Sequence, residues 1–518
     1  MTSLTFYGGI NEIGGNKILL EDGDTRIFLD FGKSFGREGE FYNDYMKPRS
    51  KGCLRDLLCM ELIPTMDGIY RDDLVHILGI EEVIRELGVE DTSYWDQELL
   101  SYGEVLERDG MPWLSGVLLS HAHQDHCGYI PYLDHRIPIY CSDVTLKILE
   151  TVEDISGDDF TAVKPFGVKR FQKGFFPGKP AIEGGDEVSR DIRAFSPGEG
   201  LRIGRLRVQT FAVDHSIPGA VAYLITTSDG KRVLYTGDFR FHGRLSRETR
   251  EFRNATRGLK PDMMICEGTR VDGVEPDSEE RVQADCTELV SRVKGFVGIE
   301  FAWKDLTRFE TLRGAARASG RTFAISARTA YLLNKLERGG EVERDPRVKV
   351  YVPRKDSMTY SPGDYGRSKY IAGFSSDWEE GGPDTRHLEN GIRAYQIKAG
   401  PKRYLVHITA WDFNELIDLQ PPDGGLFISA SSEPYDDEGV IEEERKKAWM
   451  RLFRLNPPDH ELPHIHASGH ASGPELKSFV REVGPGVLFP VHTEHPELFK
   501  GLAGEVHERI ELGKAYEC

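Results

Sequence analysis

A short segment of this chain carries three histidines and one aspartate at a spacing that suits a metal ion. They are His121, His123, Asp125 and His126. Imidazole nitrogen and carboxylate oxygen are ligands that Zn²⁺ and similar divalent ions accept without any unusual pKa. The segment follows the apolar run 113–119, which predicts a buried strand, so the ligands should leave a sheet edge together. The pattern therefore predicts a metal site, whereas a single histidine would more simply be a core residue.

Other ligand-type residues stand at the ends of further apolar runs that are typical of buried strands. Loops that leave a sheet at strand ends carry functional residues in many folds. A carboxylate in such a place can also orient a ligating histidine without touching the metal, and Asp30 is the candidate for this role. We expect the remaining ligands to come from Asp214–His215, Asp238 and His492.

The elements that must position these residues change in character along the chain. Residues 5–20 and 25–31 read as short strands with glycine turns. An acidic, helix-favouring stretch follows from about 34 to 109 and includes the amphipathic segment 81–87. This insertion separates the first strands from the metal motif in the sequence, and we expect it to form one side of a cleft.

Strands and helices alternate after Pro261. Strands are predicted at 295–301, 322–326, 348–352, 404–408 and 426–430. Asp305 is expected to cap a helix that runs to about Ser319, and another helix should contain Tyr331. This alternation implies a parallel sheet covered on both faces, in a second domain at about 270–455. The glycine-rich region 354–391 is expected to be an exposed loop.

Composition limits the class of protein. A chain of 518 residues favours two domains, and 39% hydrophobic with 29% charged residues is ordinary for a globular protein. Its first residues lack the pattern of a signal peptide, and no apolar run approaches membrane-spanning length, so no membrane association is expected. Seven cysteines without a C-x-x-C pair indicate reduced thiols in a cytoplasmic protein.

The net charge of −19 argues against broad, non-specific binding of nucleic acid, since a polyanion is repelled at long range. A local basic stretch between 240 and 260 could overcome this repulsion. Its three-residue spacing would put several arginines on one side of a helix, although a merely solvated helix face is an equal alternative. The candidate RNA-binding residues there are Arg244, Arg247 and Arg250.

The ordered set of ligands resembles the metallo-β-lactamase superfamily of dinuclear metallohydrolases. Glu267, His470 and His492 look like the three additional motifs of its β-CASP nuclease branch. The opening segment 8–16, together with the sequences around the last two histidines, is most similar to ribonuclease J and its archaeal-type relatives. The resemblance implies an αββα sandwich with an inserted β-CASP α/β domain of mainly parallel sheet. We expect its parts at 1–269, 270–455 and 456–518.

The resemblance also implies a role for each ligand. Two divalent metal ions are expected, Zn²⁺ first and Mn²⁺ as the alternative, and they would activate water and stabilise the transition state. Asp238 would bridge the two ions. One metal would be held by His121, His123 and His215, and the other by Asp125, His126 and His492.

The leaving 3′-oxygen of a phosphodiester needs a proton. His470 is the candidate donor, and Glu267 is expected to hold its imidazole in the useful tautomer. Ser468 and Ser472 flank His470, and the resemblance implies that this turn binds a phosphate of the substrate, although a purely structural turn is nearly as good an interpretation. His492 at the third additional motif favours RNA over DNA, by family resemblance alone.

The leading hypothesis is therefore a metal-dependent ribonuclease that acts on single-stranded RNA, 5′→3′ exonucleolytic with endonuclease activity as a further option. The alternatives are a DNA nuclease of the same fold, a small-molecule hydrolase acting on a thioester or lactam, and a catalytically inactive RNA-binding subunit. Relatives usually continue into a C-terminal domain that helps assembly; this chain ends soon after His492, which leaves the expectation of a homodimer open.

Overall fold

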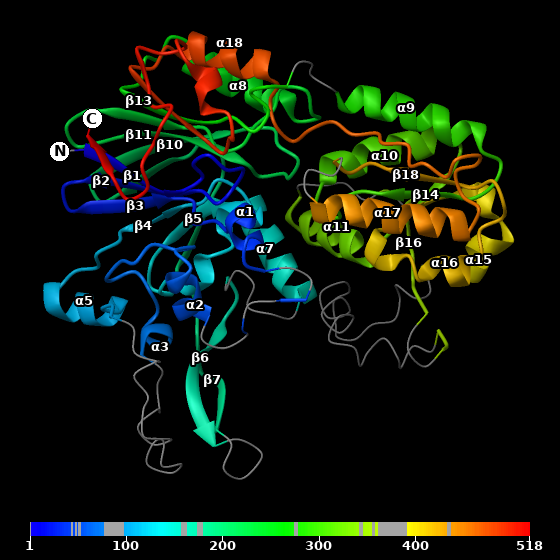
Figure 1. The fold of residues 1–518 in the computed structure, drawn as a ribbon, viewed down its shortest axis with the longest axis horizontal. Coiled ribbons are helices and arrows are strands. Elements are labelled where there is room, and N and C mark those ends of the chain that lie inside the picture. The colour runs from blue at the N-terminus through cyan, green and yellow to red at the C-terminus, as the bar shows by residue number, and fades with distance from the viewer. Residues whose placement is uncertain are drawn as a thin grey trace.

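Two stacked β-sheets and a separate parallel-sheet lobe make up the molecule (Figure 1). The computed structural model describes residues 2–517 apart from 43–44, 47–48, 50–52, 77–97, 157–162, 174–179, 274–277, 341–344, 346, 355–357, 361–390 and 433–436. The predicted amphipathic segment 81–87 and most of the predicted loop 354–391 lie outside the described residues.

Each sheet of the sandwich has seven strands. The first runs in the order β21 (Ala515–Glu517), β1 (Thr2–Gly8), β2 (Lys17–Asp22), β3 (Thr25–Leu29), β4 (Gly116–Leu118), β5 (Ile139–Ser142) and β8 (Ile192–Phe195). The second runs in the order β20 (Glu505–Val506), β19 (Val487–Val491), β13 (Met263–Glu267), β12 (Arg232–Tyr235), β11 (Val221–Thr226), β10 (Leu206–Ala212) and β9 (Gly200–Ile203). The final strand β21 pairs with β1, so both ends of the described chain lie in the first sheet.

Apolar side chains from both sheets form the central layer of the sandwich, among them Phe6, Tyr223 and Phe489. Helices α8 (Ser246–Thr256) and α18 (Gly473–Val483) pack on the outer face of the second sheet. Helix α7 (Asp143–Ser156) covers the outer face of the first. This is the predicted αββα sandwich.

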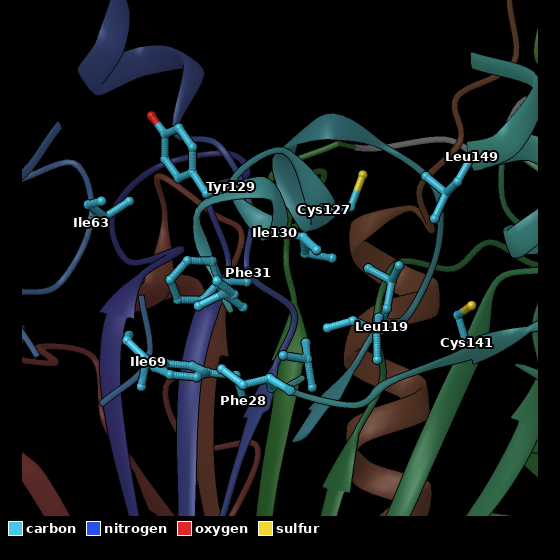
Figure 2. Close-up of a cluster of buried hydrophobic side chains, with 14 of the residues drawn as sticks. Phe28, Phe31, Ile63, Ile69, Leu119, Cys127, Tyr129, Ile130, Cys141 and Leu149 are labelled. Carbon is cyan, nitrogen blue, oxygen red and sulfur yellow. The ribbon is translucent and has the colours of Figure 1, made fainter. Parts of the chain in front are cut away.

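The outer face of the first sheet carries a further apolar cluster, drawn in Figure 2. Phe28, Phe31 and Leu119 come from the ends of sheet strands, and Ile63 and Ile69 come from the 34–109 insertion. The insertion holds the helices α1 (Phe35–Gly39), α2 (Cys53–Cys59), α3 (Asp72–Val75) and α5 (Tyr102–Asp109). Burying its apolar residues against the sheet fixes the loops that follow β3 and β4.

A five-stranded parallel sheet forms the core of the parallel-sheet lobe, which we define as residues 279–455. Its order is β16 (Lys349–Val350), β15 (Thr322–Ile325), β17 (Tyr404–His407), β14 (Val297–Glu300) and β18 (Leu426–Ser429). The helices on its two faces are α9 (Glu279–Arg292), α10 (Leu306–Ala318), α11 (Ala327–Gly339), α15 (Ala394–Ala399), α16 (Glu415–Leu419) and α17 (Asp437–Leu452). The predicted parallel sheet with both faces covered is confirmed.

Local sequence signals account for the boundaries of these elements. The Asp305 side chain accepts a hydrogen bond from Arg308 N and begins α10, as predicted. Ser326 caps α11 in the same way through Thr329 N. The hairpin β6 (Phe166–Lys173) and β7 (Pro180–Val188) points away from the sandwich (Figure 1). No helix within the described residues combines the length and apolar character that crossing a bilayer requires.

Candidate metal centre

The predicted ligands come together because they follow strands whose carboxyl ends share one edge of each sheet. Strands β3 and β4 are parallel neighbours, and so are β12, β13 and β19. Strand β10 runs in the same direction as β12, since both are antiparallel to β11. The turns that leave these strands therefore meet at one end of the sandwich. Every predicted ligand lies on one of these turns.

Three imidazoles form the first ligand group, which we define as His121, His123 and His215. His123 Nδ1 lies 3.1 Å from His121 Nε2 and 3.1 Å from His215 Nε2. A tetrahedral zinc ion about 2.0–2.1 Å from each nitrogen requires ligand atoms about 3.3 Å apart. The three lone pairs can therefore point at one ion.

The second ligand group is Asp125, His126, Asp238 and His492. His492 Nε2 lies 3.0 Å from Asp125 Oδ2 and 3.4 Å from Asp238 Oδ2, and His126 Nε2 lies 3.1 Å from the same Asp238 oxygen. Asp238 Oδ2 is also 3.8 Å from His121 Nε2. This carboxylate stands between the two groups and can bridge them.

The donor set fits a pair of divalent ions. Among the described residues no hydrogen-bond donor reaches Asp238 Oδ1, although this oxygen is buried. A buried carboxylate oxygen without a partner is costly, and a metal ion bound there removes the cost. Imidazole and carboxylate ligands suit zinc, manganese and related ions alike. The cluster can therefore bind metal, and its ligand types do not select the element.

Burial sets the protonation of these imidazoles. It lowers the pKa of all three histidines of the first ligand group well below the usual value, to about 3 for His123. In the second group burial is the largest single influence and opposes protonation too, but the neighbouring carboxylates, Asp238 first and then Asp125, together outweigh it and raise the pKa of His126 and His492. Neutral imidazole is the form that binds metal, so the first group is ready for an ion and the second must release protons to it.

Most ligating histidines are held through the ring nitrogen that does not face the metal. His126 Nδ1 lies 2.6 Å from Asp30 Oδ2, which is the contact expected of Asp30. Such partners fix the tautomer and the ring orientation. Three further partners were not predicted: Ser120 Oγ for His121, Thr269 Oγ1 for His492 and the Gly469 carbonyl for His215. Ser120 adjoins the metal motif and Thr269 follows Glu267, so proximity in sequence was the available signal for these two.

His470 and Glu267 form a pair at the rim of the ligand groups. His470 Nδ1 lies 3.2 Å from Glu267 Oε2, and the Glu267 carboxylate also accepts hydrogen bonds from Phe239 N and Thr269 N. Glu267 is buried, whereas the His470 side chain is 18% exposed. His470 Nδ1 is also 4.0 Å from Asp238 Oδ2, which makes it a conceivable metal ligand. The closer contact favours the predicted pairing with Glu267.

The glycine-rich opening segment 8–16 packs against two members of the second ligand group, Asp125 and His492. A Cβ on Gly14 would lie 2.6 Å from Asp125 Cβ, so the segment can pass this close only without a side chain. Asn16 N donates to the Asp125 carbonyl over 3.1 Å, and His492 N donates to the Gly9 carbonyl over 2.7 Å. The segment thus fixes the backbone of two ligands.

The two predicted phosphate-binding serines, Ser468 and Ser472, differ in burial and in hydrogen bonding. Ser472 is fully buried, and its hydroxyl donates to Glu475 Oε2 over 2.8 Å in a capping box at the start of α18. This cap argues for the structural interpretation of Ser472 rather than for a phosphate contact. Ser468 is half-buried, and its Oγ accepts a hydrogen bond from His470 N over 3.2 Å.

Most arginines of the basic stretch already have partners within the protein, so fewer of them are available to RNA than the sequence suggests. Arg247, on α8, forms an ion pair with Glu251 at 2.7 Å. Arg244 precedes the helix, and its Nε donates to Thr311 Oγ1 over 2.8 Å. Arg250 is exposed on α8. Arg253 and Arg257, further along, both pair with Glu482, so part of the positive charge is already neutralised.

One cation near the centre was not predicted. Lys304 lies on the turn between β14 and α10, where the Asp125 carboxylate acts on its ammonium group. The neighbouring Leu306 belongs to the same buried apolar cluster as Cys127 of the metal motif. Burial lowers the pKa of Lys304. Within the described part of the chain no carboxylate forms an ion pair with it. Lone lysines give no sequence signal.

Two family models match the chain. The model described as "Beta-lactamase superfamily domain" matches residues 93–276, and the model described as "Zn-dependent metallo-hydrolase RNA specificity domain" matches residues 461–503. These segments contain every member of the two ligand groups and His470. Over both segments the chain is similar to metallo-β-lactamase superfamily proteins. The predicted family resemblance is confirmed.

Curated proteins similar to this chain include ribonucleases J. The chain is 24% identical over 405 residues to ribonuclease J of Thermus thermophilus, covering 74% of this chain and 59% of the relative. It is 22% identical over 508 residues to ribonuclease J of Helicobacter pylori, covering 95% of this chain and 56% of the relative. The chain thus spans between half and two thirds of the length of these relatives.

A solved structure shows the same fold. It is a protein of unknown function from Enterococcus faecalis V583, with a TM-score of 0.68, 23% sequence identity and coverage of 99% of both chains. The likeness extends over the sandwich and the parallel-sheet lobe together. The predicted fold class, a metallo-β-lactamase sandwich with an inserted α/β domain, is confirmed, while the predicted boundaries at 269 and 455 stay predictions.

Proposed function

We propose that this chain is a metal-dependent ribonuclease that hydrolyses phosphodiester bonds of single-stranded RNA. Its main activity would be 5′→3′ exonucleolytic, with internal cleavage as a second mode. The observation that carries the proposal is the pairing of a dinuclear ligand set with His470 and Glu267 at its rim. The match of residues 461–503 to an RNA specificity domain and the similarity to ribonucleases J support RNA as substrate.

The ligand groups would hold two divalent ions, Zn²⁺ or Mn²⁺, with Asp238 between them. When bound, such ions supply Lewis acidity and water activated for attack near neutral pH. The burial of the ligand groups excludes bulk water and strengthens the electrostatic interactions of the site with a phosphate.

His470 would protonate the leaving 3′-oxygen. Glu267 holds Nδ1 at 3.2 Å, so Nε2 is the ring nitrogen that remains to carry the proton to the substrate. The partial exposure of His470 fits this role, because the donor must meet the substrate at the rim of the buried centre. Of the two flanking serines, Ser468 is the more exposed, because it is half-buried whereas Ser472 is buried. Ser468 is therefore the better candidate for a contact with the substrate phosphate.

A cleavage assay tests the proposal. One sequence is prepared as RNA and as DNA, each with a 5′-monophosphate or a 5′-hydroxyl and a 3′ label, and is incubated with metal-loaded protein or with a His123→Ala control. Stepwise shortening of monophosphorylated RNA alone is the expected result. Internal cuts at either 5′ end would make endonuclease action the main activity, and degraded DNA beside intact RNA would overturn the substrate. Homodimer formation and a cytoplasmic location stay predictions.

A further inference from the structure

Arg240 is fully buried two residues after the bridging aspartate, and its guanidinium reaches three separate parts of the chain. Nε donates to Asp214 Oδ1 over 3.2 Å, Nη1 to the Ser468 carbonyl over 2.9 Å, and Nη2 to Thr307 Oγ1 over 2.8 Å. Asp214 immediately precedes a metal ligand, and Ser468 lies two residues before the candidate proton donor. One side chain therefore contacts both segments and the parallel-sheet lobe.

Further buried charged side chains connect Arg240 to helices α9 and α10 of the parallel-sheet lobe. Arg240 Nη1 lies 3.5 Å from Glu279 Oε1 at the start of α9. Glu279 accepts hydrogen bonds from Arg308 Nη2 over 3.0 Å and from Thr311 Oγ1 over 2.6 Å, both on α10. We call Asp214, Arg240, Glu279 and Arg308 the buried ion chain. All four side chains are at most 1% exposed.

The segment that brings His470 to the site is fixed at four successive residues. The carbonyl groups of the first three accept hydrogen bonds, and the imidazole of the fourth contacts a carboxylate. The partners, in order, are Arg308 for Ala467, Arg240 for Ser468, His215 for Gly469 and Glu267 for His470. Two of the four partners belong to the buried ion chain, so the placement of His470 depends on that chain.

Stability alone does not account for this arrangement. Removing charged groups from water is unfavourable, and well-packed apolar residues in the same place often stabilise a fold as much as a buried ion pair or more. The buried ion chain also fixes the orientation of the segments it connects, because a planar guanidinium holds its hydrogen-bond acceptors at defined angles. Gly243 supports the point: a Cβ there would overlap both Arg240 Nε and Asp214 Oδ2, so the backbone closes tightly over this pair.

We propose that Arg240 is a positioning residue of the metal centre, and that the buried ion chain holds His215 and His470 in register with the parallel-sheet lobe. Arg240 acts through Asp214 and the Ser468 carbonyl and does not itself touch the substrate. The inference rests on the proposed function for its kinetic consequence. Breaking a link should displace His470 and disturb the His215 ligand while leaving most contacts with bound RNA in place. Turnover should therefore fall more than binding.

The test compares Arg240→Lys and Glu279→Gln with wild type. Arg71→Lys is the control, because Arg71 forms an ion pair with Asp73 at 2.6 Å whose side chains are only 5% exposed, and the further partners of this pair lie outside the metal centre. Each protein is loaded with Co²⁺ for its visible spectrum and with the active metal for kinetics on monophosphorylated RNA. In the two chain variants we expect kcat to fall about 10- to 100-fold with KM within about threefold, since misplacement near 1 Å has effects of this size.

The Co²⁺ spectrum separates this inference from the proposed function. An altered spectrum in Arg240→Lys and an unchanged one in Arg71→Lys support positioning, even if the wild-type protein proves not to cleave RNA. Wild-type spectra and turnover in both chain variants would overturn the inference, and so would equal losses in Arg71→Lys. Should Arg240→Lys fail to fold, Thr307→Val removes one hydrogen bond to Arg240 and carries the same expectations in milder form.

Discussion

Most ligating side chains at the metal centre form pairs. In each pair one side chain can bind a metal ion, and the other forms a hydrogen bond to it on the side away from the metal. His126 with Asp30 and His492 with Thr269 are examples in which the outer partner lies 2.6–2.7 Å from the ring. Asp30 and His492 both adopt positive φ, at 58° and 52°. Backbone strain of about 1–3 kcal/mol at such residues is kept where the surroundings hold it and the site requires it.

His470→Gln should separate proton donation from metal binding. With the imidazole gone, turnover should fall about 10²- to 10⁴-fold, the usual contribution of a general acid. Metal content measured by mass spectrometry of the native protein should remain that of wild type, since the contact of His470 with Glu267 is closer than that with Asp238. Loss of one ion from the variant would instead identify His470 as a ligand.

Lys304→Gln should weaken RNA binding. The ammonium interacts with Asp125 and pairs with no carboxylate of the described residues, so it is available to a phosphate. If it neutralises one phosphate, the slope of log Kd against log salt should decrease by about 0.7, as for single strands. Fluorescence anisotropy measures this. Lys514→Gln, which removes an exposed lysine paired with Glu511, is the control, and equal slopes for the two variants would refute the contact.

At the scale of elements, parallel strand ends collect the ligands and a glycine-rich turn supports them. The turn after β4 delivers four ligands, the turns after β10, β12 and β19 deliver one each, and the turn after β3 delivers the orienting Asp30. They meet because neighbouring strands in each sheet end at the same edge. The opening segment then approaches Asp125 so closely that Gly14, at φ +83°, has no room for a side chain. Its glycines are thus explained by contact as well as by conformation.

Gly14→Ala should lower the affinity for metal. The new Cβ would press on Asp125 and displace its carboxylate, in addition to the cost of a positive φ. Gly230→Ala is a matched control, since Gly230 has φ +85° with nothing within 4 Å of its Cβ position. Chelator competition should show about 10- to 100-fold weaker binding for Gly14→Ala than for the control, the range seen when the support of a ligand is lost. Equal affinities would contradict the proposed support.

At the scale of the whole molecule, the site depends on a chain that leaves the sandwich and returns. Strand β13 ends the first pass at Glu267, the parallel-sheet lobe follows, and the return segment supplies His470 and His492 beside it. The buried ion chain lies where these parts meet. Because the ligands span residues 121–492, metal binding should stabilise the global fold and not one loop.

Metal removal should therefore lower the temperature of unfolding of the whole protein. A ligand at 100 times its Kd adds about 2.7 kcal/mol to the free energy of unfolding. Differential scanning calorimetry with and without a chelator measures the change, and His123→Ala should show a smaller shift than wild type. An unchanged transition after verified metal loss would mean that the ligand groups are held together without the ions.

Local sequence signals were enough to predict the parallel sheet of the lobe, whereas the αββα sandwich was predicted from the family resemblance. Alternating strands and helices after residue 261 gave the parallel sheet, and Asp305 marked the start of α10. Caps and periodicities act between residues close in sequence, so they can be recognised there. Contacts between distant residues carry no such signal. Arg240 and Ser468, for example, are 228 positions apart, and their contact could not be anticipated.

By itself the sequence determined the types of ligand, their order and their places at strand ends, because donor chemistry and hydrophobic periodicity are local properties of the chain. The division into two ligand sets, with Asp238 between them, was predicted from the family resemblance, and only the tertiary structure gives the distances within and between the sets. It also brought Lys304 and the buried ion chain to the site. These outcomes depend on packing between segments hundreds of residues apart, where geometry and burial, rather than residue type, set the role of a side chain.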